Sequence, residues 1–129
     1  MILVDSSVWV DFFSSSPGRG GRELRRMIEE SEPFAITGVI VTEVLQGLTR
    51  DVAAIERLLA NCDMLEPEGF ETYQHAAVIY RAARAKGVTL TTIDTLIAAI
   101  AIEHGVKVFT LDQDFAHMAR VAAVEPYRF

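Results

Sequence analysis

Two short apolar runs in this 129-residue chain are each followed by an aspartate. Ile2-Leu3-Val4 precedes Asp5, and the run VKVFTL at 106–111 precedes Asp112. Short β-branched runs suit buried strands. A charge placed directly after a buried strand has little structural use, whereas side chains that follow parallel strands point into the ligand crevice of a sheet. The two runs therefore predict strands that deliver acids to one site.

Segments with helical spacing of apolar residues lie between these runs and other strand-like stretches. We expect strands at 2–4, 34–38, 64–67, 106–111 and 122–125, and a loop at 14–21. We expect helices at 6–13 (with Ser6 and Ser7 as possible caps), 22–30, 39–47, 52–62, 69–86, 94–104 and 114–120, several of them ended by Gly47, Gly87 or Gly105. This alternation predicts an α/β fold, with a mostly parallel sheet of about four to five strands and helices on both faces.

The length of the chain predicts a single domain over 1–129, because cores of this size are the commonest. No apolar run approaches the roughly 18 residues of a membrane span, and no basic segment precedes the first strand. We therefore expect a soluble, cytoplasmic protein. Cys62 is the only cysteine and forms no internal disulfide, so we assign it no chemistry.

Further acids stand at positions that favour the same edge of the sheet. Asp114 follows Asp112 by two residues, and Asp94 opens the helix that leads into the run at 106–111. Glu43 is the one acid of an otherwise apolar helical stretch, GVIVTEVLQGL, and an unpaired carboxylate would be costly to bury there. It needs a partner, which is either an arginine or the site formed by the other acids.

Convergence of these carboxylates would require a positive counter-charge. Two carboxylates about 4 Å apart repel by roughly 4 kcal/mol at an effective dielectric constant near 20. A hard divalent cation, Mg²⁺ or Mn²⁺, is the natural solution, and it supports hydrolysis of phosphodiester bonds. The net charge of −6 argues against a nucleic-acid partner, but it becomes −1 without these five acids.

The motifs resemble those of the PIN-domain ribonucleases, in particular the VapC-like toxins of toxin–antitoxin pairs. ILVDSSV is similar to the opening strand with its first acid, and TEVLQGL to the second motif with Glu43. TTIDTLIAAIAIEHGVKVFTLDQDF resembles the third and fourth motifs, with Asp94, Thr110, Asp112 and Asp114. The resemblance spans nearly the whole chain and implies a PIN-like three-layer sandwich.

The resemblance also implies a function, a cofactor and partners. It implies an endoribonuclease dependent on Mg²⁺ or Mn²⁺ that cleaves structured cellular RNA, either tRNA or rRNA, and so stops translation. A cognate antitoxin would cover the site, and the toxin would form a homodimer or a hetero-oligomer with the antitoxin. The implied catalytic residues are Asp5, Glu43, Asp94, Asp112 and Asp114, with Asp5, Asp94 and Asp112 on the metal. Ser6 and Thr110 would support them.

Each residue also has a purely structural interpretation. Aspartates such as Asp94, Asp112 and Asp114 are common at helix starts and in turns, and a serine such as Ser6 is common as a helix cap. Arg19, Arg22, Arg25 and Arg26 lie within eight positions. Such a run is usually a solvated face, but here it suits RNA phosphates or an acidic antitoxin segment equally. The three histidines show no metal-ligand spacing.

Two other functions are compatible with acids at strand ends. An aspartyl phosphatase or phosphotransfer domain also gathers acids and Mg²⁺ there. Asp5 lacks a second aspartate two residues on, however, and no lysine follows a late strand. A PIN-fold binding module without activity would have no need of acids at all four motifs. The sequence favours the nuclease.

Overall fold

The strands of the computed structural model, which describes residues 1–129, form one parallel sheet. They are β1 (Ile2–Val4), β2 (Phe34–Ile36), β3 (Asp63–Met64) and β4 (Lys107–Phe109), in the order β3-β2-β1-β4. Every pairing is parallel, β1 with both β2 and β4, and β2 with β3. The predicted α/β fold is confirmed, with four strands.

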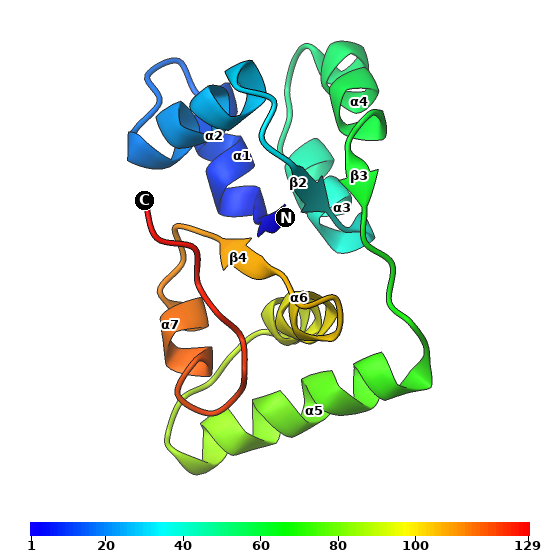
Figure 1. The fold of residues 1–129 in the computed structure, drawn as a ribbon, viewed down its shortest axis with the longest axis vertical. Coiled ribbons are helices and arrows are strands. Elements are labelled where there is room, and N and C mark those ends of the chain that lie inside the picture. The colour runs from blue at the N-terminus through cyan, green and yellow to red at the C-terminus, as the bar shows by residue number, and fades with distance from the viewer.

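Helices cover the sheet on both sides, as predicted. They are α1 (Ser6–Phe13), α2 (Arg19–Glu29), α3 (Gly38–Gln46), α4 (Val52–Ala60), α5 (Phe70–Ala85), α6 (Thr92–Glu103) and α7 (Asp114–Met118). In Figure 1, α1 and α2 lie on one side of the strands, and α5 and α6 lie on the other. None of the helices combines the length and the apolar character needed to cross a lipid bilayer.

The core is one cluster of 23 buried hydrophobic residues that reaches from Leu3 to Val124. Trp9 is fully buried within it, and its ring lies 5.8 Å from that of Phe13 and 5.9 Å from that of Phe34. Aromatic pairs at these separations add stability beyond their buried area. The core thus contains residues from both ends of the chain.

The predicted loop at 14–21 is shorter than expected, because α2 already begins at Arg19. The side chain of Asp11 explains this start: it accepts hydrogen bonds from the backbone N–H groups of Gly18 (2.9 Å) and Gly21 (2.7 Å). A Cβ on Gly21 would stand 2.9 Å from the backbone of Phe12. The glycines that indicated a loop therefore allow close packing of α2 on α1.

The predicted strand at 122–125 is not formed. Only an isolated parallel bridge joins Val108 to Pro126. The N–H of Val108 donates to the carbonyl of Glu125 (2.9 Å), and the N–H of Tyr127 donates to the carbonyl of Val108 (2.8 Å). Pro126 has no N–H group, so the ladder cannot extend through it.

Several helix boundaries follow the predicted turn chemistry. Gly87 and Gly105 adopt φ angles of 79° and 65°, as residues that end helices commonly do. Asp51 precedes α4 but makes no side-chain cap bond, and its φ is 59°. The predicted caps Ser6 and Ser7 are wrong: both lie inside α1, and Asp5 occupies the N-cap position.

Candidate active site

The carboxyl ends of β1 and β4 meet where the strand order reverses. From β1 the chain runs outward through β2 to β3, and it then returns to β4 on the other side of β1. The N–H of Asp5 donates to the carbonyl of Phe109 (2.9 Å), which continues the β1–β4 pairing by one residue. Ligands of open parallel sheets bind in the crevice at such a reversal. The fold thus places Asp5 at the expected position.

Asp5 is buried and held by two hydroxyl groups. It is only 4% exposed. Its Oδ2 accepts hydrogen bonds from Ser7 Oγ (2.8 Å) and Thr110 Oγ1 (2.9 Å). Its Oδ1 accepts none from the protein. Buried carboxylates need such partners, and the two hydroxyls fix one oxygen while the other stays available for a ligand.

The segment after β4 forms a turn that aims two more carboxylates. The N–H of Asp112 donates to Thr110 Oγ1 (2.9 Å), and the N–H of Asp114 donates to Asp112 Oδ1 (2.9 Å). The second bond is an Asx turn, so the structural interpretation of Asp112 holds as well. Asp114 then opens α7.

Asp94 lies in the first turn of α6, where Thr91 caps the helix by accepting the N–H of Asp94 (3.1 Å). Burial is the main reason that the pKa of Asp94 rises to about 6, and the negative charges of Asp112, Asp5 and Asp114 raise it further. Hydrogen bonding to Thr91 opposes this rise. A carboxylate in that environment gains from a cation beside it.

Glu43 projects from α3 toward the first turn of α1. Ser6 Oγ donates to Glu43 Oε1 (3.1 Å). Burial raises the pKa of Glu43, the bond from Ser6 lowers it, and the charges of Asp5 and Asp112 raise it again. No arginine pairs with Glu43, so the alternative of an internal ion pair is wrong.

The five predicted acids are therefore connected by electrostatic interactions, Glu43 with Asp5 and Asp112, and Asp94 with Asp5, Asp112 and Asp114. Asp94, Asp112 and Asp114 each offer an oxygen within 4.8 Å of the other two. No lysine, arginine or histidine forms an ion pair with any of the five. Hard carboxylate oxygens without a protein counter-charge fit Mg²⁺ or Mn²⁺. This group of three contains Asp114 in place of Asp5, whereas the predicted metal ligands were Asp5, Asp94 and Asp112.

Of the four arginines at 19–26, Arg19, Arg22 and Arg25 are exposed and Arg26 is partly exposed. Arg26 is bound by carboxylates, lying 2.6 Å from both Glu23 and Glu30 and 2.7 Å from Glu32. The guanidinium groups of the other arginines contact the chain as well: that of Arg19 bonds to the carbonyl of Phe129 and lies over its ring, that of Arg22 donates to Pro17, and that of Arg25 lies over Phe12.

A second group of possible metal ligands has internal partners. Glu68, Glu103 and His104 also lie within 4.8 Å of one another. Glu103 accepts hydrogen bonds from the hydroxyl of Thr72 (2.6 Å) and the N–H of Glu68 (2.7 Å), and His104 Nε2 lies 2.8 Å from the carbonyl of Glu66. These bonds fasten the start of α5 to the end of α6.

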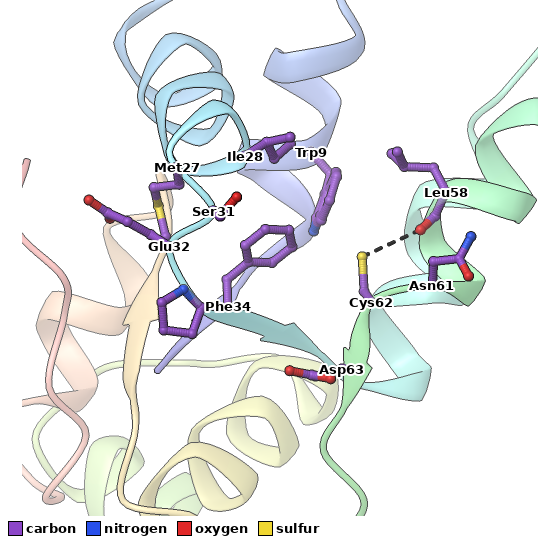
Figure 2. Close-up of a pocket in the computed structure, with 11 residues that line it drawn as sticks. Trp9, Met27, Ile28, Ser31, Glu32, Phe34, Leu58, Asn61, Cys62 and Asp63 are labelled. Atoms are coloured by element: carbon purple, nitrogen blue, oxygen red, sulfur yellow. Dashed lines mark hydrogen bonds between the residues drawn. The ribbon is translucent and has the colours of Figure 1, made fainter.

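None of the five predicted site acids lines the cavity in Figure 2, which lies at the amino-terminal ends of β2 and β3. It encloses about 320 Å³ between α2, β2 and α4, and its lining includes Trp9, Phe34 and Cys62. The thiol of Cys62 donates to the carbonyl of Leu58 (3.5 Å), and burial raises its pKa. A thiol held in the protonated form is a poor nucleophile, which agrees with assigning it no chemistry.

Sequence reasoning missed two residues of the site, Ser7 and Thr91. Ser7 was considered only as a helix cap, yet its hydroxyl bonds to Asp5. The signal was present in the repeated hydroxyl of DSSV, because neighbouring residues of a helix point about 100° apart and so reach different acids. Thr91 stands three residues before Asp94, the spacing of a cap and its recipient amide.

Comparison with known proteins agrees with this geometry. The family model described as PIN domain matches residues 2–121. The VapC ribonuclease Mb1587 of Mycobacterium bovis and the ribonuclease VapC11 of Mycobacterium tuberculosis are each 37% identical to the chain over 133 aligned positions, which cover 100% of this chain and 99% of each relative.

Several solved structures have a similar fold. VapBC2 of Rickettsia felis, bound to a promoter DNA fragment, superposes with a TM-score of 0.76 at 15% identity, covering 100% of this chain and 99% of that one. FitAcB of Neisseria gonorrhoeae superposes with a TM-score of 0.72 at 20% identity, covering 99% of this chain and 97% of that one. The sarcin–ricin loop cleaving toxin VapC20 of M. tuberculosis superposes with a TM-score of 0.64 at 16% identity, covering 90% of this chain and 93% of that one. The chain belongs to the PIN domain family and, within it, to the VapC ribonucleases.

Proposed function

We propose that this VapC-type ribonuclease is an endoribonuclease that hydrolyses RNA with Mg²⁺ or Mn²⁺ held by Asp94, Asp112 and Asp114, with Asp5 contributing its Oδ1. The observation that supports it most is the meeting of three carboxylate oxygens within 4.8 Å at the β1–β4 edge, without an ion-pair partner. Carboxylates in this arrangement favour a divalent cation as their counter-charge, because no cationic side chain of the chain pairs with them.

The residues of the site would divide the work of hydrolysis. A bound divalent ion supplies electrostatic stabilisation of the phosphate and lowers the pKa of water. Asp94, Asp112 and Asp114 would hold the ion, and Thr110 bonds to both Asp5 and the N–H of Asp112 and so keeps them in place. Glu43 has a raised pKa, and its Oε2 accepts no hydrogen bond from the protein, so Glu43 is suited to orient the attacking water and accept its proton.

The substrate and partners follow from the relatives rather than from the site. VapC20 is a sarcin–ricin loop cleaving toxin, and another solved structure of similar fold is a toxin–antitoxin complex from Klebsiella pneumoniae. We infer that this chain cuts structured RNA, either tRNA or rRNA, in the cytoplasm, and that a cognate antitoxin blocks the site. We further infer a homodimer or a toxin–antitoxin hetero-oligomer. Arg19, Arg22 and Arg25 are exposed and suit RNA phosphates or acidic antitoxin residues, whereas Arg26 is bound by its own chain.

The alternative of a phosphotransfer domain has little support in the structure. The chain has two lysines, and neither follows the carboxyl end of a strand. Lys86 ends α5, and Lys107 begins β4 at the opposite edge, where it lies 3.5 Å from Glu125. No ammonium group is thus placed to hold a phosphoryl group at the acids. Hydrolysis of an aryl phosphate that Asp5→Asn abolishes would instead favour this alternative.

Incubation with total cellular RNA tests the proposal directly. We expect the purified protein to produce discrete cuts in the presence of Mg²⁺ or Mn²⁺ and none with excess EDTA, because the carboxylates alone cannot stabilise the developing charge. Sequencing of the cut ends identifies the RNA and the bond. Cutting that persists in EDTA would contradict the metal mechanism.

Binding of Mn²⁺ should depend on pH because the pKa of Asp94 is about 6. A ligand carboxylate must lose its proton before it can bind metal. Below pH 6 Asp94 is mostly protonated, so the affinity should fall by about tenfold for each further pH unit, whereas it should change little above pH 7. Calorimetric titration between pH 5 and 7.5 measures this. Asp94→Asn should bind more weakly and give a flatter profile, and equal profiles would refute the assignment.

A further inference from the structure

The hydroxyl of Ser7 joins three segments of the site. Ser7 Oγ donates to Asp5 Oδ2 (2.8 Å) and accepts the backbone N–H of Leu111 (2.9 Å). Thr110 Oγ1 likewise donates to Asp5 Oδ2 (2.9 Å) and accepts the N–H of Asp112 (2.9 Å). Each hydroxyl thus accepts one amide proton and donates its own proton to the same carboxylate oxygen, and the two hydroxyl oxygens lie 3.3 Å apart.

This network couples the positions of two acids from different strands. Asp5 follows β1, whereas Asp112 follows β4, and no bond between the two carboxylates could set their separation, because like charges repel. Ser7 lies on α1, which is a separate element from both β1 and the turn after β4. Its hydroxyl therefore ties the turn carrying Asp112 to the carboxylate of Asp5 from a third element.

We propose that Ser7 is a positioning residue that holds Asp5 and the Leu111–Asp112 turn at the spacing required for divalent-cation binding. This inference rests on the proposed function. Residues that orient metal ligands through hydrogen bonds commonly change metal affinity or activity by 10–100-fold when they are replaced.

A merely structural role for Ser7 has little support. Its hydroxyl makes no hydrogen bond to the backbone of α1, whose N-cap residue is Asp5. Alanine has a higher helix propensity than serine, so Ser7→Ala should leave α1 at least as stable. The loss of the hydroxyl should therefore act on the acids and on the turn, rather than on the helix.

The test compares Ser7→Ala, Ser7→Thr and the matched control Ser14→Ala. Ser14 ends α1, and its hydroxyl bonds to the carbonyl of Asp11 (2.7 Å), away from the acids. Calorimetric titration with Mn²⁺ should show 10–100-fold weaker binding for Ser7→Ala, and binding close to wild type for Ser7→Thr and Ser14→Ala. Melting in EDTA should differ little among the four proteins.

Amide hydrogen exchange in EDTA gives a second result that does not depend on metal. Ser7→Ala should speed the exchange of the Leu111 amide by at least tenfold, because this amide loses its acceptor, and Ser7→Thr should restore protection. Unchanged exchange, or Mn²⁺ binding by Ser7→Ala within twofold of wild type, would overturn the inference. If the wild type itself binds no Mn²⁺, the proposed function fails, and the exchange result alone decides whether Ser7 holds the turn.

Discussion

Asp94→Asn should lower the rate of RNA cleavage by roughly 10³-fold or more, equivalent to about 4 kcal/mol of lost transition-state stabilisation. Asparagine preserves the shape of the side chain and removes the charge that, in the proposed site, would hold a divalent cation beside Asp112 and Asp114. The remaining carboxylates would bind the ion more weakly and in altered geometry. Initial rates on a defined RNA, at saturating Mg²⁺ and at several lower concentrations, measure the loss.

Asp63→Asn is the matched control for this substitution. Asp63 is exposed and begins β3, at the edge of the sheet opposite to the acids. The Asp63→Asn variant should cleave RNA at the wild-type rate. Asp112→Asn should lose as much activity as Asp94→Asn, and the double variant should be little worse, because groups that act as a unit are strongly non-additive. Activity of Asp94→Asn within tenfold of wild type would remove Asp94 from the metal site.

Divalent metal should reverse the order of stability of wild type and Asp94→Asn. In the folded protein the pKa of Asp94 is about 6, above its ordinary value of 3.8. The folded state therefore holds a proton that the unfolded state has lost between these two values, and stability falls as the pH rises through that window. A shift of this size corresponds to about 3 kcal/mol for a fully buried group.

Asp94 is only partly buried, so solvent screening should reduce this contribution to about 1–2 kcal/mol. In EDTA at pH 7, Asp94→Asn should accordingly be the more stable protein by that amount. At a Mn²⁺ concentration one hundred times the dissociation constant, wild type should gain about 2.7 kcal/mol and become the more stable. Urea denaturation of both proteins, with and without metal, measures the crossing. A variant less stable than wild type in EDTA would contradict the raised pKa.

The parallel sheet was predictable from short patterns, whereas the order of its strands was not. Apolar runs that end in Asp5 and Asp112 predicted neighbouring strand ends, and the structure pairs β1 with β4 in parallel. The need of Glu43 for a partner was predictable because its helix is otherwise apolar, and Ser6 is the residue that bonds to it. These features depend on hydrophobic periodicity and on the cost of burying charge, which are local properties of a sequence.

Features that depend on contacts between distant segments were not predictable. The helical state of Arg19–Gly21 depends on the carboxylate of Asp11, a neighbour in space across the turn. The roles of Ser6 and Ser7 depend on which way the first turn of α1 faces, since each hydroxyl bonds to a different acid. Composition favours loops and caps for glycine and serine, but tertiary contacts override that preference here.

The two outer edges of the sheet restrict how another protein can bind. Beside β4, the residues around Pro126 already occupy the hydrogen-bonding groups of Val108, and at the far side β3 is only two residues long (Figure 1). Short or covered edges resist β-augmentation and the fibrous aggregation that begins with it. An inhibitory partner therefore has little sheet edge to pair with, and we expect it to bind mainly through side chains. Toxin and inhibitor pairs can then diverge by ordinary surface substitutions, without any change to the backbone of the fold.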